Sequence, residues 1–201
     1  MKRTKTRILT ECALMVALGT VLSFIKLWEA PLGGAVTLFS TVPIMYISYA
    51  YGLKWGLATG FVHSSIQLLF GLGTVAYVPS ALGIILCILL DYIFPFTIIG
   101  LAGIFRGAKI VKKPGTNTLI CSLLGALVAC AFRFLSSFFC GAVVWYELTK
   151  ALDWNEYVHT VGMWTYTFVY NATYMFPDIA LALVALPIMV KLLTLRHKDS
   201  I

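Results

Sequence analysis

Long apolar segments dominate this chain and limit the folds that it can adopt. The 201 residues are 60% hydrophobic and only 11% charged, and the mean hydropathy is +0.92. A water-soluble domain needs a mostly polar surface, which this composition cannot supply. A spanning helix takes about 20 apolar residues, so a chain of this length has room for roughly six of them. The sequence therefore predicts a multi-pass integral membrane protein.

The apolar segments are continuous and rich in Leu, Ile and Ala, which is typical of helices rather than of the short alternating strands of a membrane barrel. We expect an all-α fold, a bundle of six transmembrane helices that forms a single substrate-binding domain over residues 1–201. The predicted helices cover about 8–27, 38–52, 55–72, 79–105, 117–146 and 164–194.

The basic residues sort to one side of this topology. If both termini lie inside, only Lys26 and Lys150 fall on the outer face, and Arg133 lies within an apolar segment. The inner face collects Lys2, Arg3, Lys5, Arg7, Lys54, Arg106, Lys109, Lys112, Lys113, Lys191, Arg196 and Lys198. Because short cytoplasmic loops are enriched in Lys and Arg, both termini are expected in the cytoplasm. The net charge of +7 then reflects topology, and no nucleic-acid partner is expected.

Two charged residues interrupt the apolar segments. A charge in the middle of a membrane costs at least about 2.5 kcal/mol, so Asp91 and Arg133 need a reason to be there. Asp91 lies some 12 residues from the outer end of its predicted helix, which is about 18 Å, and Arg133 lies equally deep in the next helix. Asn171, on the last helix, is slightly shallower. The three helices are thus predicted to bring polar groups together in the outer half of the bilayer.

Helical spacing puts further residues beside this point. Arg133, Ser137, Gly141 and Trp145 are four residues apart and share one helix face, which indicates a pocket wall with an aromatic at its mouth. Pro95 removes the amide that would bond to the carbonyl of Asp91 and loosens that helix.

The last helix presents a similar face. Asn171, Tyr174 and Asp178 follow one another at i, i+3 and i+7, and Tyr166 lies above Asn171. The alternative to a pocket is that Asp91 and Arg133 neutralise each other and only hold the bundle together. For His63 and Gln67, one turn apart, hydrogen bonding between helices is the expected role.

Known catalytic and metal-binding patterns are absent from the sequence. There is no GxxxxGK[ST] phosphate loop, and no HExxH or GxSxG motif, so neither ATP hydrolysis nor other catalysis is expected. The five cysteines are odd in number, lack CxxC pairs and lie in apolar segments, which indicates small core residues. We expect no metal and no cofactor.

Ala13 and Ala17 form a small-xxx-small face on the first helix. Such a face lets another helix approach closely in lipid, either a helix of this chain or one of a partner protein.

Four stretches resemble the substrate-binding S-components of energy-coupling factor (ECF) vitamin transporters, and among them the thiamine-specific family. They are LTECALMVALGTVLSFI, LDYIFPFTIIGLAGIFR, RFLSSFFCGAVVW and YTFVYNATYMFP. The resemblance implies a non-enzymatic capture subunit in the bacterial cell membrane, with thiamine as its ligand in an outward-facing pocket. It also implies that Ala13 and Ala17 dock onto a transmembrane coupling subunit, which two cytoplasmic ATPase subunits drive.

The resemblance further implies a lid, about Trp28 to Thr41, and a set of ligand-binding residues. These are Asp91, Tyr92, Arg133, Ser137, Trp145, Tyr166 and Asn171. In two of these positions the chain departs from similar thiamine binders, because Ser137 stands where a His is common and Asp91 where a Glu is expected. A thiamine precursor or another heteroaromatic vitamin is therefore an alternative ligand, and a non-transporting membrane scaffold is an alternative function.

Overall fold

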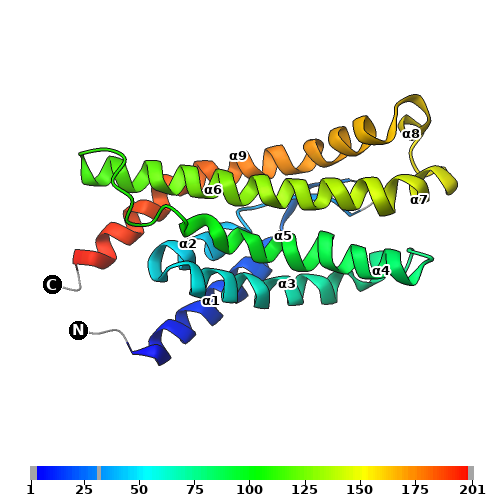
Figure 1. The fold of residues 1–201 in the computed structure, drawn as a ribbon. Coiled ribbons are helices and arrows are strands. Elements are labelled where there is room, and N and C mark those ends of the chain that lie inside the picture. Colours follow the sequence, from blue (N-terminus) through cyan, green and yellow to red (C-terminus); the bar gives the residue numbers. More distant parts are fainter. Residues whose placement is uncertain (1–3, 31–32, 199–201) are drawn as a thin grey trace.

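The computed structural model is predominantly helical (Figure 1). It describes residues 4–30 and 33–198, with side chains described up to residue 193. Lys2 and Arg3, predicted on the inner face, and residues 31–32 of the predicted lid lie outside the described residues. The elements in chain order are α1 (Lys5–Ser23), β1 (Lys26–Glu29), β2 (Ala35–Thr37), α2 (Val42–Tyr51), α3 (Leu53–Val75), α4 (Ala81–Cys87), α5 (Phe94–Thr97), α6 (Pro114–Cys140), α7 (Tyr146–Ala151), α8 (Tyr157–Thr160) and α9 (Met163–Lys198).

Four helical stretches of the described chain are long and apolar enough to cross a membrane, in agreement with a multi-pass protein. They are Lys5–Ser23, Ala81–Gly103, Pro114–Ala151 and Met163–Leu193. The first turn of α1, the connection before α6 and the end of α9 lie at the same end of the bundle (Figure 1). The count of six spans and the cytoplasmic location of the termini stay predictions.

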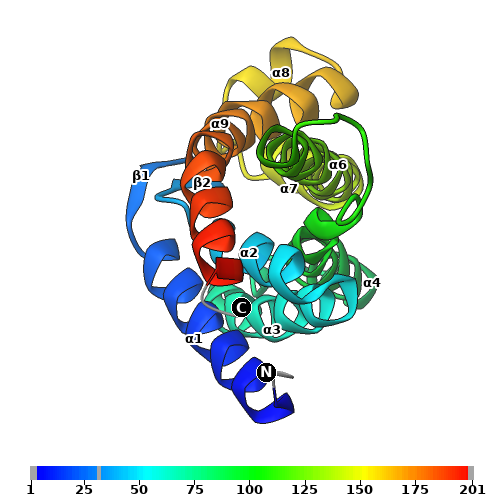
Figure 2. The ribbon, with the colours of Figure 1, turned by 90° about the vertical axis from the view of Figure 1, so that its left-hand side faces the viewer.

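The segment predicted as the second span, 38–52, forms a short internal helix. α2 has ten residues, about 15 Å of helix, which is half the thickness of the hydrocarbon core. Ile44, Met45 and Ile47 are completely buried, and α2 lies among the longer helices in the view along the bundle (Figure 2). Its apolar residues therefore form part of the protein core, packed with Val16 of α1 and Leu186 of α9.

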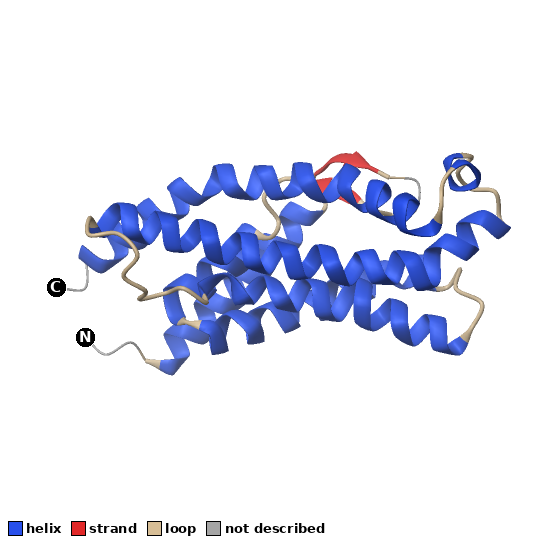
Figure 3. Ribbon diagram, turned by 45° about the horizontal axis from the view of Figure 1, so that its top comes forward, coloured by secondary structure: helices blue, strands red, loops and turns tan. Residues whose placement is uncertain are grey.

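The prediction of an all-α fold was wrong in one detail, because an antiparallel hairpin follows α1. β1 and β2, the red strands in Figure 3, form a two-stranded antiparallel sheet. Trp28 lies opposite Val36, and Glu29 lies opposite Ala35. Gly33 in the connection has a φ of +94°, which glycine adopts without steric cost. Val36 packs against Tyr174 and Met175, so the hairpin is attached to α9. The predicted lid segment thus has regular structure of its own.

Two of the long helices contain a π-helical turn. Ile88–Ile93 joins α4 to α5, and Gly141–Trp145 joins α6 to α7. Such turns arise where the regular bonding pattern is interrupted and are frequent at functional sites. In the first of them the carbonyl of Leu90 accepts a hydrogen bond from Ser136 Oγ at 2.6 Å. The loosening predicted from Pro95 therefore coincides with a real irregularity.

Glycines allow α3 to pack closely on its neighbours. A Cβ added to Gly56 would lie 2.5 Å from the carbonyl oxygen of Gly100, whereas one added to Gly73, on the same helix, would meet nothing within 4 Å. We predict that Gly56→Ala destabilises the protein by about 1–3 kcal/mol, because the backbones must separate. Gly73→Ala is the matched control and should be neutral or stabilising by up to about 1 kcal/mol. Thermal unfolding in detergent measures both, and equal melting temperatures would contradict the packing described.

Candidate ligand-binding site

A cavity of about 420 Å³ lies between the hairpin, α3, the α4–α5 segment, the α6–α7 segment and α9. This volume is within the range that small-molecule sites occupy. The structure places every sequence-predicted ligand-binding residue on its wall, namely Asp91, Tyr92, Arg133, Ser137, Trp145, Tyr166 and Asn171. Gly141 lines it as well, so the helix face predicted from the spacing of four is a cavity wall.

Asp91 lies in the first π-helical turn and is held by an aromatic side chain. Trp145 Nε1, in the second π-helical turn, donates a hydrogen bond of 2.6 Å to Asp91 Oδ2. The two irregular turns thus position a carboxylate and an indole against each other across α4 and α6. Among the described residues, no basic side chain forms an ion pair with Asp91.

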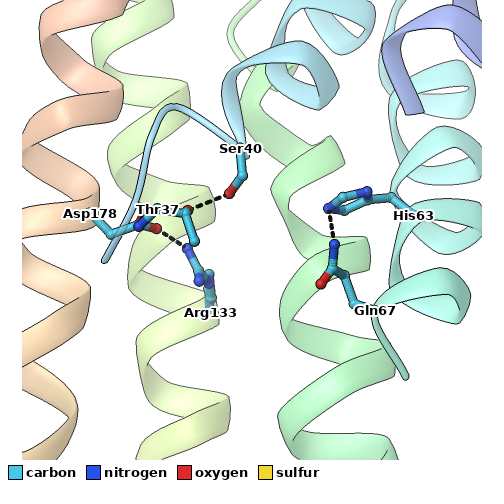
Figure 4. A network of polar contacts seen from close by, with 6 residues as sticks. All are labelled: Thr37, Ser40, His63, Gln67, Arg133 and Asp178. Carbon is cyan, nitrogen blue, oxygen red and sulfur yellow. Dashed lines mark hydrogen bonds and ion pairs between the residues drawn. The ribbon is translucent and has the colours of Figure 1, made fainter. Parts of the chain in front are cut away.

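Arg133 pairs with a different acid from the one considered in the sequence. Its Nη1 lies 2.7 Å from Asp178 Oδ2, and both side chains are buried. The other oxygen of Asp178 accepts two bonds from Thr37, 3.1 Å from the backbone N and 2.9 Å from Oγ1. Thr37 Oγ1 is also 2.6 Å from Ser40 Oγ (Figure 4). The alternative in which Asp91 and Arg133 neutralise each other is therefore wrong.

This pairing decides the charge of the cavity. Four charged residues line it, and two of them, Lys26 and Glu29, form an ion pair of 2.6 Å with each other. Arg133 is neutralised by Asp178, so Asp91 remains as the single uncompensated charge among the described residues of the wall. A buried carboxylate without a counter-ion is costly, and a ligand with positive charge lowers that cost. The cavity is electrostatically suited to a cation.

The polar groups of α9 are partly engaged by neighbours. Asn171 Nδ2 donates to the carbonyl of Thr167 at 2.9 Å, and Asn171 Oδ1 accepts from Tyr174 at 2.6 Å. An amide offers two donors and two acceptor positions, so one of each remains for a ligand. Aromatic rings supply much of the remaining wall, with Tyr166 stacked on Tyr170 at 6.1 Å between centroids.

His63 and Gln67 link α3 to α1, as expected from the sequence. His63 Nδ1 is 3.4 Å from Thr20 Oγ1, and Gln67 Nε2 is 2.9 Å from Ser23 Oγ. Gln67 Nε2 also lies 3.4 Å from His63 Nε2 (Figure 4). His63 is buried and does not line the cavity, whereas Gln67 does.

Several wall residues were not predicted individually as ligand-binding residues, although Glu29 and Thr37 fall within the predicted lid. These wall residues come from the hairpin, from α3 and from α9, and include Glu29, Thr37, Gln67, Gly71 and Tyr170. Asp178 was noted only as part of a polar helix face. Because Asp178 and Arg133 carry opposite charges, an ion pair between them was one possibility. The sequence contains no information on which of the two buried acids, Asp91 or Asp178, Arg133 reaches.

Comparison with known proteins adds to this geometry. Residues 9–197 match the family described as Thiamine transporter protein (Thia_YuaJ). Thiamine transporter ThiT of Bacillus subtilis (strain 168) is 31% identical over 185 residues, which cover 89% of this chain and 87% of that protein. A solved structure of ThiT from Listeria monocytogenes has the same fold, with a TM-score of 0.70 at 19% identity over 94% of this chain and 96% of that one.

Proposed function

Because the chain belongs to the Thiamine transporter protein family, as its sequence resemblance predicted, we propose that it captures thiamine for uptake as the S-component of an ECF transporter. In this proposal the protein is not an enzyme, and separate subunits hydrolyse ATP. It is a single six-helix domain of the bacterial cell membrane with both termini in the cytoplasm, and the cavity opens to the outside.

The observation that carries the proposal is the uncompensated charge of Asp91 in a cavity rich in aromatic side chains. Thiamine combines a permanently cationic ring with an aminopyrimidine. A carboxylate satisfies the cation, and the face of Trp145, Tyr92 or Tyr166 attracts it further. The free donor and acceptor of Asn171 suit the aminopyrimidine edge. Ser137 provides a hydroxyl on the same wall.

A titration of the purified protein with a panel of vitamins tests this proposal. Thiamine should quench the fluorescence of Trp145 saturably at sub-micromolar concentration, and Trp145→Phe should remove that part of the signal. If a thiamine precursor or another heteroaromatic vitamin binds more tightly than thiamine, that compound is the ligand, and the proposed role as a capture subunit still holds. A flat titration with every vitamin would favour the scaffold alternative.

We propose that a partner docks on the exposed side of α1, the side that faces away from the rest of the bundle. Ala13 and Ala17 are exposed, as are Leu14 and Leu18 beside them, whereas Cys12 and Val16 face the interior. The small residues thus lie on the surface and are not used for packing within the chain. A transmembrane coupling subunit can approach closely there.

We predict that Ala13→Trp and Ala17→Trp abolish thiamine uptake and leave thiamine affinity within about twofold, because the added rings block close helix contact without touching the cavity. Transport is measured as uptake of labelled thiamine by cells that also produce the coupling and ATPase subunits. Thiamine affinity is measured by titration of the purified variants. Ala58→Trp, an exposed alanine of α3, is the matched control and should transport normally. Normal uptake by the α1 variants would refute the docking surface.

A further inference from the structure

Two buried cysteines lie directly behind the cavity carboxylate. Cys87 is the last residue of α4, one turn before Asp91, and Cys140 is the last residue of α6, just before the second π-helical turn. The sulfur atoms of both cysteines and a carboxylate oxygen of Asp91 all lie within 4.8 Å of one another. Both cysteines are completely buried and carry free thiols. Within the part of the chain that the structure describes, no other three His, Cys, Asp or Glu side chains converge in this way.

We propose that Cys87, Cys140 and Asp91 form a binding site for a soft divalent cation of the zinc and cadmium class. Thiolate sulfur is the preferred ligand of these ions, and two thiolates with one carboxylate are a suitable donor set. Zinc–sulfur bonds of about 2.3 Å place tetrahedral ligand atoms somewhat closer together than 4.8 Å, so small side-chain movements close the site.

The ion reaches this site through the cavity, because Asp91 lines the cavity wall while both sulfurs lie behind it. Binding exchanges two thiol protons for one M²⁺ ion. The protons leave to water in the cavity, and the two sulfur–metal bonds and one oxygen–metal bond form without any change of oxidation state. A water molecule from the cavity supplies a fourth ligand. This site was not predictable from the sequence, because the cysteines are 53 positions apart and lack CxxC spacing.

Metal binding and vitamin binding exclude each other at Asp91. The metal ion uses the carboxylate that, under the proposed function, receives the cationic vitamin, and it adds positive charge where the vitamin carries its own. The exclusion rests on the proposed function, whereas the metal site itself does not. At a metal concentration about ten times its own Kd, the apparent Kd for thiamine should rise about tenfold.

Titration of the purified full-length protein with Cd²⁺ alone, in a non-thiol reductant, tests the site. Wild type should develop the ultraviolet absorption of thiolate-to-cadmium charge transfer, with one ion bound per chain and a change in Trp145 fluorescence. Cys87→Ser/Cys140→Ser should lose the absorption, and each single replacement should weaken Cd²⁺ binding at least about tenfold. Cys130→Ser, on α6 and equally buried, is the matched control and should bind Cd²⁺ like wild type.

The results separate the two proposals. No absorption band in wild type, or a band of unchanged intensity and Cd²⁺ affinity in the single variants Cys87→Ser and Cys140→Ser, would overturn the metal site whether or not the double variant folds. A band that depends on both cysteines, together with a thiamine Kd that Cd²⁺ leaves unchanged, would support the metal site and overturn the exclusion. Failure of every vitamin of the panel to bind without Cd²⁺ would overturn the proposed function and leave the metal site standing.

Discussion

Replacing Asp91 with asparagine is expected to weaken thiamine binding by about 2–5 kcal/mol, or roughly thirtyfold to several thousandfold. Asparagine keeps the shape of the side chain and an oxygen that can accept from Trp145, so the local structure is retained. What is lost is the single uncompensated charge of the cavity wall. Equilibrium titration with thiamine measures the change in Kd.

The control for this variant is Glu147→Gln, which removes an exposed acid of α7 that does not line the cavity. It should leave the Kd unchanged, since exposed charges are screened by solvent. If Asp91→Asn bound thiamine as well as Glu147→Gln does, the charge of Asp91 would have no part in recognition. If Asp91→Asn failed to fold, its role would be structural.

Replacing Asp178 with alanine should destabilise the protein by about 3–5 kcal/mol, because it leaves the buried guanidinium of Arg133 without its partner. The same change releases Thr37, and with it the hairpin, from α9. Thermal unfolding in detergent measures the loss of stability. The dissociation rate of thiamine measures the release of the hairpin. Glu147→Ala removes an exposed acid of α7 and is expected to have neither effect. Equal unfolding temperatures for the two variants would contradict the account.

Two further variants separate the stability of the bundle from attachment of the hairpin. Arg133→Met/Asp178→Leu replaces the ion pair with apolar side chains, so it should recover stability and still release thiamine faster than wild type. Thr37→Val keeps the ion pair and removes the hydroxyl that bonds to Asp178 and Ser40. It should speed thiamine release with a loss of stability near 1 kcal/mol. Thiamine release at the wild-type rate in both variants would show that Asp178 does not hold a lid.

The helices and the cavity residues were predictable because their signals are local in the sequence. Apolar runs of spanning length mark the long helices, and spacing by three or four puts Arg133, Ser137 and Trp145 on one face. The known rise per residue of a helix is sufficient to predict that Asp91 and Asn171 lie at similar depths in the membrane.

What the sequence could not predict depends on contacts between distant segments. α2 has the same apolar sequence whether it faces lipid or protein, so its burial could not be predicted from the sequence. Arg133 could pair with either of two acids, and only the packing of α6 against α9 selects Asp178. The hairpin forms where two short segments meet against α9, and the approach of Cys87 to Cys140 requires the α4 and α6 ends to lie side by side.

The decisive experiment is a structure of the protein solved with thiamine, because it gives the distances from the Asp91 carboxylate to the ligand. We expect thiamine in the cavity with a positively charged or N–H-bearing group within about 4 Å of an Asp91 oxygen, and with Arg133 still paired to Asp178. Thiamine bound elsewhere, or bound in the cavity with Asp91 contacting only Trp145, would contradict it.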